Sequence, residues 1–173
     1  MSQQTENSMR KIFLSKIVLN MGVGKSGEPI EIGKKTLTQI TGKKPNARNA
    51  KKSQRDWGIR KGEPIGVAVT VRGNAATELL KRLLVAKDNK INQRAIDNEG
   101  NVSFGIKEHI DIPEIKYDPK IGILGLEVSI ALARSGFNIK VRSQQKSKVG
   151  KKHRIAKNDA IKFLTEKFGV QIV

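Results

Sequence analysis

The sequence contains no cysteine, and its two histidines, His109 and His153, stand 44 residues apart. Disulfides and thiol catalysis are therefore excluded, and a zinc site would lack its usual cysteine and histidine ligands. Long apolar runs are also missing, because Lys16 and Asn20 interrupt the stretch from residue 12 to residue 24. We therefore expect neither a signal peptide nor a membrane span, and a cytoplasmic protein without a metal or cofactor.

Acidic residues are scarce, and the surplus of positive charge is unevenly distributed. The 173 residues include 34 lysines and arginines against 16 acids, which gives a formal net charge of +18. Residues 43–61 contribute +7 and residues 134–157 contribute +9, so the rest of the chain is nearly neutral. A charge that served only solubility would be spread over the surface, whereas this segregation is typical of binding to nucleic-acid phosphates.

The length and composition fit one compact domain, since a typical domain has about 100–200 residues. Hydrophobic residues make up 37% of the chain, which is enough for a single core. Residues 1–10 are mostly polar and predict a disordered lead-in, so the folded domain is expected at residues 11–173. Within it we expect a projecting loop at 53–64 and a basic extension at 134–157.

Alternation of apolar residues predicts several strands. The stretch Ile65–Arg72 alternates strictly and is the clearest of them. In the stretch 11–23, Lys16 and Asn20 fall on the face left for binding. The buried face of that strand is expected to hold Phe13, Ile17, Leu19, Met21 and Val23. Further strands are expected at 43–53, 102–112 (broken at Gly105), 126–132 and 137–142.

Three helices are expected between these strands. The first, Glu28–Thr41, has Pro29 in its first turn and Gly42 just after its end. The other two begin at Asn74 and Asn158, whose side chains can cap a helix. The order β-α-β-β-α-β-β-β-α predicts a single α+β domain, with a mainly antiparallel sheet packed on one side by helices and with basic projecting loops.

The basic window 43–61 is too highly charged for a balanced solvated surface. It contains the single tryptophan, Trp57, and Arg48, Arg55 and Arg60 lie among small or polar residues. Arginine and aromatic planes can stack on unpaired bases while lysines hold phosphates. We therefore interpret this window as a nucleic-acid contact, in which Lys51 and Lys52 also face the polyanion.

The second basic segment, 134–157, contains no acid. Such a segment reads as an extension that becomes ordered by folding onto RNA. The residues that we expect to contact RNA there are Lys146, Lys148, Lys151, Lys152 and Arg154.

A glycine-rich motif, GVGKSG at residues 22–27, leaves a nucleotide site open as an alternative. A dinucleotide fold would place an acid about 20 residues later, where this chain has the basic stretch 43–52. A phosphate-binding loop would require a glycine at the position of Leu19. A tight turn between a strand and a helix is the simpler interpretation.

The acids Glu108, Asp111, Glu114 and Asp118 lie near His109 and could indicate acid–base catalysis. No nucleophile or metal ligand accompanies them, so we favour structural ion pairing.

Five stretches together resemble a known family, universal large-subunit ribosomal protein five, which carries 5S ribosomal RNA. They are LNMGVG (19–24), LTQITGKKPNARNAKKS (37–53), IRKGEPIG (59–66), VTVRG (69–73) and NVSFGIKEHIDIPEIKYD (101–118). The stretches ARSGFNIKVR (133–142) and KHRIAKNDAIKFL (152–164) are similar to the archaeal and eukaryotic branch, so the resemblance is to an archaeal-type member.

This resemblance implies a non-enzymatic large-subunit protein that brings 5S rRNA into the central protuberance and also contacts 23S rRNA and P-site tRNA. The resemblance also implies neighbouring ribosomal proteins as partners. It implies neither a membrane nor a small-molecule substrate as a partner. The implied 5S rRNA contacts are Asn20, Met21, Gly22, Lys43, Lys44, Thr70 and Arg72. The implied tRNA-contacting loop includes Ser53, Gln54, Arg55, Trp57, Arg60 and Lys61.

Two rival classes remain at this point. A general packaging or chromatin protein would share the charge but would not prefer 5S rRNA. A nucleotide-dependent enzyme built on GVGKSG would bind ATP or NAD.

Overall fold

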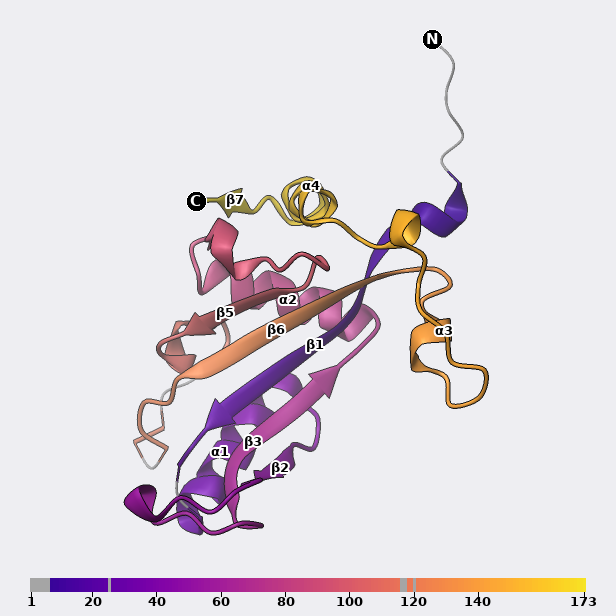
Figure 1. The fold of residues 1–173 in the computed structure, drawn as a ribbon. Coiled ribbons are helices and arrows are strands. Elements are labelled where there is room, and N and C mark those ends of the chain that lie inside the picture. The colour runs from indigo at the N-terminus through magenta and orange to yellow at the C-terminus, as the bar shows by residue number, and fades with distance from the viewer. Residues whose placement is uncertain (1–6, 25, 116–117, 120) are drawn as a thin grey trace.

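A computed structural model describes residues 7–24, 26–115, 118–119 and 121–173. Its centre is a twisted five-stranded sheet with the order β2-β3-β1-β6-β5, in which every neighbouring pair is antiparallel (Figure 1). The strands are β1 (Ile12–Gly22), β2 (Asn46–Asn49), β3 (Pro64–Val71), β5 (Val102–Ile106) and β6 (Leu126–Arg134). The predicted α+β fold with a mainly antiparallel sheet is confirmed.

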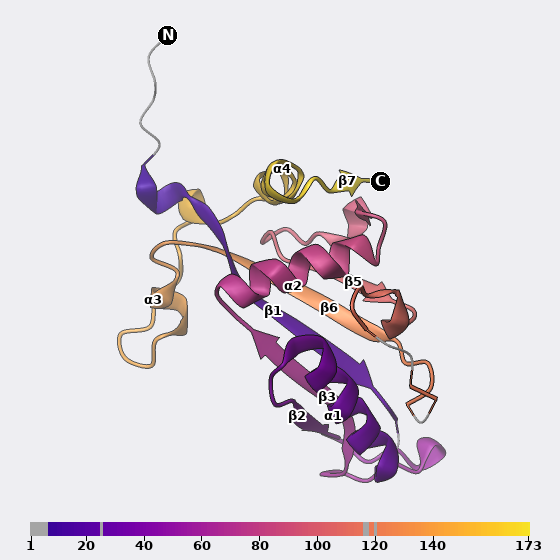
Figure 2. The same ribbon diagram turned by 180° about the vertical axis from the view of Figure 1, so that it is seen from behind.

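Two helices cover one face of this sheet. They are α1 (Glu28–Thr41) and α2 (Asn74–Val85), and both lie in front of the strands in the reverse view (Figure 2). The middle of the opposite face has no helix over it (Figure 1). The expected packing of helices on one side of the sheet therefore leaves the other side open.

A small second unit of structure lies at one end of the sheet. Helix α4 (Lys157–Phe168) is followed by β7 (Gln171–Ile172), which pairs in parallel with β4 (Lys90–Ile91). Ala160, Phe163 and Leu164 of α4 join the hydrophobic core. The carboxyl end of the chain is thereby attached to the segment that follows α2.

The core follows from the alternation of β1. Ile17, Leu19 and Met21 are almost completely buried against the two helices, as expected for the apolar side of a strand. Helix α1 approaches the sheet closely at Gly33, where a Cβ atom would lie 3.1 Å from Cγ2 of Val67. A residue without a side chain therefore allows this close packing of helix and sheet.

Phe13 does not follow the same alternation. The pairing of β1 with β6 shifts between Leu14 and Lys16, so β1 has one extra residue at this point. An extra residue inverts the two faces of a strand. Leu14 packs against the core, whereas Phe13 is 45% exposed. The prediction that Phe13 shares the buried face with Ile17 is therefore wrong.

The strand predicted at 137–142 is also wrong, because residues Asn138–Val141 form the short helix α3. Both edges of the preceding strand β6 are already paired, with β1 and with β5. The chain turns away through Gly136, which has φ 91°. Neither edge of β6 is therefore free to accept these residues, although their apolar side chains alternate.

Two helix starts and two strand lengths differ from the expectation. Helix α2 begins at Asn74 itself after an N-cap at Gly73, and α4 has its N-cap at Ala156, so neither Asn74 nor Asn158 is a cap. Strand β2 occupies only four residues of the expected stretch 43–53. Strand β5 ends at Ile106 and is followed by a 3-10 helix at His109–Asp111.

The basic extension has contacts of its own with the protein. Val149 and Ile155 are buried, and the ring of Phe137 meets that of His153 edge-on, with centroids 5.7 Å apart. His153 Nε2 lies 2.8 Å from the Ser135 carbonyl oxygen. The segment is therefore anchored to the body of the domain at several points.

Most of the expected lead-in, residues 1–6, falls outside the described residues. Ser8–Arg10 form a 3-10 helix, at whose start the Asn7 side chain accepts a hydrogen bond from the amide of Met9 at 3.0 Å. Among the described helices, none is both long and apolar enough to cross a bilayer.

Candidate nucleic-acid interface

The open face of the sheet presents small and polar side chains. Strand pairing places Asn20 between Glu127 of β6 and Ala68 of β3, and Ala68 lies opposite Asn46 of β2. The next row along the sheet joins Thr70, Val18, Ser129 and Ser103 in the same way. Because residues paired across antiparallel strands point to the same side, these rows form one surface. A surface made mostly of small side chains permits close approach of another molecule.

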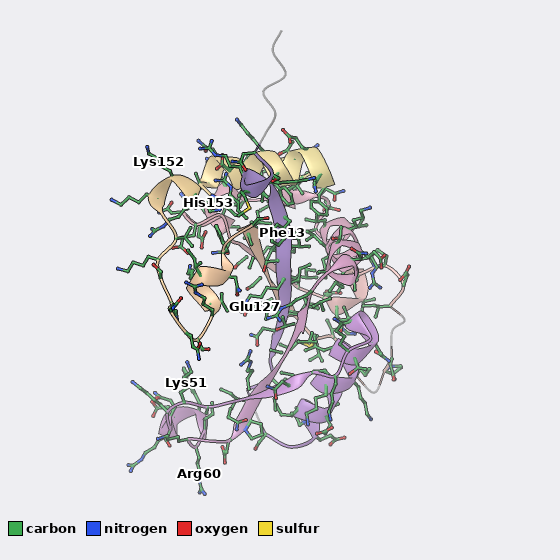
Figure 3. All side chains as sticks on the ribbon, turned by 90° about the vertical axis from the view of Figure 1, so that its right-hand side faces the viewer. Phe13, Lys51, Arg60, Glu127, Lys152 and His153 are labelled. Carbon is green, nitrogen blue, oxygen red and sulfur yellow. The ribbon has the colours of Figure 1, made fainter. Side chains whose placement is uncertain are left out.

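Glu127 is the one acid among the described strand positions on this face. Its Oε2 accepts a hydrogen bond from Asn20 Nδ2 at 3.1 Å. In the edge-on view of the sheet, Glu127 lies on the side away from α1 and α2 (Figure 3). The carboxylate therefore fixes the amide of Asn20 and is exposed to whatever occupies the open face.

Two basic projections extend from that same side of the sheet. Figure 3 shows the loop with Lys51 and Arg60 at one end, and the extension with Lys152 at the other. Within the described part of the chain, no acid forms a salt bridge with the basic residues of 43–61 or with those of 146–154. The positive charge of both projections is thus available to an anionic partner.

The first projection, residues 50–63, is held by its own hydrogen bonds. The amide of Ala50 donates to the Glu63 carbonyl at 2.8 Å, and Gln54 and Ile59 exchange two backbone hydrogen bonds at 2.8 and 3.0 Å. The amide of Lys61 donates to Ser53 Oγ at 2.9 Å. These bonds form a narrow ladder that presents its tip away from the sheet.

The tip itself is the 3-10 helix Arg55–Trp57, which ends at Gly58 in the left-handed conformation. Trp57 is 75% exposed. Its indole ring therefore presents an aromatic face to the solvent, on which an unpaired base could stack. Residues 50–63 thus form a hairpin with an exposed ring at its end.

The predicted 5S rRNA positions fall in three places. Asn20 and Thr70 lie on the open face, and Lys43, Lys44 and Arg72 are exposed near its end. Since Asn20 pairs with Ala68, Arg72 lies four residues farther along the chain, just after the end of β3 and about 13 Å from Ala68. Asn20 and Thr70 thus lie on one face of the sheet, and Arg72 follows Thr70 by two residues.

Gly22 and Met21 differ in what they expose. Gly22 is exposed at the end of β1, whereas the side chain of Met21 is 1% exposed in the core. Only the main chain of Met21 is left for a contact with another molecule.

The remaining predicted RNA positions are all on the surface. Of these, Arg154 is held by a hydrogen bond from its Nε to the Val149 carbonyl at 3.2 Å. The exposed residues are Arg48, Lys51, Lys52, Gln54, Arg60, Lys61, Lys146, Lys148, Lys151, Lys152 and Arg154.

The glycine motif does not have the geometry of a dinucleotide fold. Strand β1, which precedes it, is antiparallel to both neighbours, whereas a dinucleotide fold requires parallel strands. The amides of Val23 and Gly24 donate to the Ile65 carbonyl at 3.0 and 2.9 Å. The motif is therefore a turn against β3; its Lys25 lies outside the described residues.

Two residues of this acidic region, His109 and Glu114, have structural contacts. His109 is buried, and its Nδ1 accepts a hydrogen bond from the amide of Leu124 at 3.3 Å. Glu114 forms a salt bridge with Arg82 at 3.0 Å, which confirms the expected ion pairing for this residue. The described residues contain no group of acids and histidines that could hold a metal ion.

Sequence reasoning missed part of the open face, namely Asn46, Ser103, Glu127 and Ser129. A signal existed for two of them, because Glu127 and Ser129 occupy the polar positions of the alternating stretch 126–132. The neighbours of these residues across the sheet depend on long-range strand pairing, for which the sequence contains no local signal.

Comparison with known proteins matches nearly the whole chain. Residues 7–60 match the family model described as Ribosomal protein L5, and residues 64–163 match the model of the C-terminus of the same ribosomal protein family. The large ribosomal subunit protein uL5 of Nitrosopumilus maritimus (strain SCM1) is 62% identical over 172 residues, which cover 99% of each chain.

Two further relatives with the same name come from other archaea. The protein from Cenarchaeum symbiosum (strain A) is 56% identical over 165 residues, 95% of this chain and 98% of the relative. The protein from Pyrobaculum aerophilum is 48% identical over 164 residues, 95% of this chain and 92% of the relative.

Proposed function

The chain belongs to the L5 family of ribosomal proteins and is an archaeal-type, non-enzymatic constituent of the large ribosomal subunit in the cytoplasm; within that role we propose that it attaches 5S rRNA. Through the same side of the molecule it also contacts 23S rRNA in the central protuberance, and its projecting loop reaches P-site tRNA. Ribosomal RNA and neighbouring ribosomal proteins are its partners.

The observation that supports this proposal is the open sheet face between two basic projections (Figure 3). Among the described residues, no acid forms a salt bridge with the basic residues of 43–61 or of 146–154. A-form RNA presents its phosphates and 2′-hydroxyls over a wide, shallow minor groove. Small hydroxyl and amide side chains such as Thr70, Ser129 and Asn20 can approach such a surface and exchange hydrogen bonds with it. Lysines and arginines at the rim then neutralise phosphates, which contributes most of the affinity.

The 5S rRNA lies along the part of the sheet face formed by β1 and β3, which includes Asn20 and Thr70 and leads to Arg72. Lys43 and Lys44 follow the end of α1 directly and lead into β2, beside β3. Gly22 and the main chain of Met21 complete this contact. Exposed cations at the two ends of the face extend it to further rRNA. They are Arg48, Lys51, Lys52, Lys146, Lys148, Lys151, Lys152 and Arg154.

The hairpin tip acts on a different RNA. The 5S contact lies on the sheet face. The ladder of hydrogen bonds in the hairpin holds Arg55, Trp57 and Arg60 away from that face. An exposed ring with adjacent arginines can stack on a nucleotide and hold its phosphates. We assign this tip, with Ser53, Gln54 and Lys61 at its base, to P-site tRNA.

A competition gel shift tests the assignment to 5S rRNA. The full chain is mixed with labelled 5S rRNA at moderate salt in the presence of excess unrelated RNA. We expect the complex to persist, because a shaped surface adds selectivity to the phosphate contacts. Complete displacement by unrelated RNA would instead indicate a general packaging protein.

A further inference from the structure

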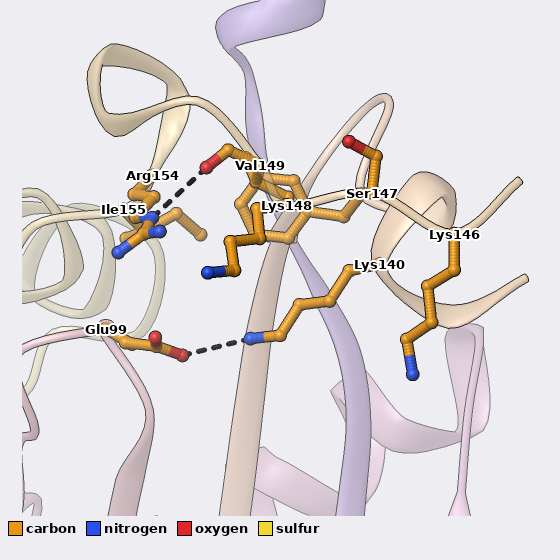
Figure 4. Close-up of a pocket in the computed structure, with 9 residues that line it drawn as sticks. Glu99, Lys140, Lys146, Ser147, Lys148, Val149, Arg154 and Ile155 are labelled. Atoms are coloured by element: carbon orange, nitrogen blue, oxygen red, sulfur yellow. Dashed lines mark hydrogen bonds and ion pairs between the residues drawn. The ribbon is translucent and has the colours of Figure 1, made fainter.

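A pocket of about 450 Å³ lies between the basic extension and the turn that includes Glu99. Phe137, Val149 and Ile155 form apolar parts of its wall. Figure 4 shows Val149 and Ile155 beside the lysines that line the pocket. Val149 is 7% exposed and Ile155 is 1% exposed, so both belong to the packed body of the protein. The pocket is therefore a hollow with an apolar wall, in a segment that otherwise consists mainly of basic surface.

The rim of this pocket is cationic. Lys146, Lys148 and Arg154 line it, and none of the three has a salt bridge within the described part of the chain. An apolar cavity surrounded by free cations fits a ligand that is flat and apolar in its centre and anionic at its ends. A nucleotide within an RNA strand has this chemistry, since a phosphate flanks its base on each side.

One acid and one further lysine contribute a polar pair to the lining. Lys140 reaches across the pocket, and its Nζ donates to Glu99 Oε2 at 3.1 Å (Figure 4). Both side chains are more than half exposed, so the pair can open at little cost. Once it is open, the carboxylate can accept from base N–H groups and the ammonium can donate to a base oxygen or nitrogen.

The pocket is built from fixed segments. The Asp97 carboxylate accepts hydrogen bonds from the amides of Glu99 and Asn101 at 2.9 and 2.7 Å, which positions the turn. On the other side, the amide of Ser147 donates to the Ile139 carbonyl at 3.1 Å. A ligand therefore meets a preformed site, which lowers the entropy cost of binding.

We propose that this pocket receives one unpaired nucleobase of ribosomal RNA, flipped out of its helix, while Lys146, Lys148 and Arg154 hold the neighbouring phosphates. The inference rests on the proposed function, because it assumes that the extension lies against RNA. Unstacked bases in loops and bulges are the usual targets of specific RNA recognition. Guanine matches the lining well, since its edge offers N–H donors to Glu99 and the O6 acceptor to Lys140.

The test measures binding of the full chain to three labelled RNA hairpins by fluorescence anisotropy. One hairpin has a single unpaired guanine, the second has an abasic residue at that position, and the third is fully paired. We expect the guanine hairpin to bind roughly tenfold more tightly than the abasic one, as for the removal of one base from an aromatic site. Equal affinities for these two hairpins would overturn the proposal that the pocket binds a base, but would leave the proposal of RNA binding intact.

Two matched variants locate the effect. Ser147→Trp fills the pocket without a change of charge, and Ser143→Trp adds the same ring at an exposed site outside the lining. We expect Ser147→Trp to abolish the preference for guanine over the abasic residue, and Ser143→Trp to retain it. Equal behaviour of the two variants would contradict the proposal. Failure of the chain to bind any hairpin at low salt would overturn the proposed function as well.

A crosslinking experiment separates RNA from protein as the occupant. A photoreactive benzophenone amino acid is incorporated at Ser147, and large subunits containing the chain are irradiated. An adduct with an rRNA nucleotide would support the proposal. An adduct with a peptide of another ribosomal protein would overturn it.

Discussion

Arg134 and Asp159 join the end of β6 to the first turn of α4, with Nη2 of the arginine donating to Oδ2 of the aspartate at 2.9 Å. The same guanidinium donates from Nη1 to the carbonyls of His153 and Arg154, at 3.4 and 3.2 Å. The side chain of Arg134 is only 11% exposed. One arginine thus holds both ends of the segment that presents the basic extension.

Replacement of this arginine should loosen the extension. In Arg134→Met the aliphatic stem remains but three hydrogen bonds are removed, one of them to a charged group, so we expect the free energy of unfolding to fall by about 2 kcal/mol. Urea unfolding measures the decrease. Hydrogen exchange at residues 150–160 should be faster in the variant than in the wild type, and exchange in the central strands should change less.

The control for this variant is Lys140→Met, which removes the exposed ion pair with Glu99. Exposed pairs contribute little, so its unfolding free energy should change by less than about 1 kcal/mol. If Arg134→Met left exchange at residues 150–160 unchanged, the extension would be held by its apolar contacts alone.

A second prediction concerns the open sheet face. Ser129→Glu places a second carboxylate two residues from Glu127 on the surface proposed for 5S rRNA. Repulsion from phosphates should lower the affinity for 5S rRNA by roughly tenfold or more, with little change in stability because the site is exposed. Filter binding measures the affinity.

Gln39→Glu, on the exposed side of α1, changes the net charge by the same amount and serves as the control. Its affinity for 5S rRNA should remain close to that of the wild type. Equal decreases in the two variants would mean that net charge, and not the open face, determines binding.

Local sequence could predict that a polar face exists, but it could not predict which residues of that face lie next to each other. Asn20 falls on the polar side of β1 by simple alternation, and Ser129 does the same in β6. The contact between Asn20 and Glu127 joins residues 107 positions apart. Such a contact depends on which strands become neighbours, and this is decided by packing of the whole sheet.

Local pattern failed where tertiary structure overrode it. The alternation that includes Phe13 is broken by a bulge against β6. Residues 137–141 also alternate, but they follow β6, whose two edges are already paired with β1 and β5. The pocket lined by Glu99 and Lys140 depends on a contact across 41 positions. The basic segments, by contrast, were visible from charge alone, because lysine and arginine side chains remain on the surface in any fold.

A third prediction separates the hairpin tip from the sheet face. The triple variant Arg55→Ala, Trp57→Ala and Arg60→Ala should bind 5S rRNA nearly as well as the wild type, because these residues lie away from the sheet. It should weaken retention of P-site tRNA on assembled ribosomes, since both the exposed ring and two cations are removed. Toeprinting or filter binding of ribosome complexes measures retention.

The variant Lys87→Ala with Arg94→Ala removes two exposed cations elsewhere and is the control for charge. It should leave tRNA retention unchanged. A collapse of 5S rRNA binding in the triple variant would show that the hairpin had been assigned to the wrong RNA.

The last prediction concerns the salt dependence of RNA binding. Replacement of Lys146, Lys148, Lys151 and Lys152 by alanine should reduce the slope of log affinity against log salt by about one unit for each phosphate that the chain no longer neutralises. The four lysines are exposed and have no acidic partner among the described residues, so the fold should be retained. Titrations with rRNA at several salt concentrations give the slope.

A control with the same change in net charge replaces four exposed lysines outside the proposed interface, namely Lys35, Lys81, Lys87 and Lys90. Because counterion release depends on phosphates that the protein touches directly, the control should keep the wild-type slope, and an equal decrease in both variants would exclude the extension as a specific RNA-binding segment.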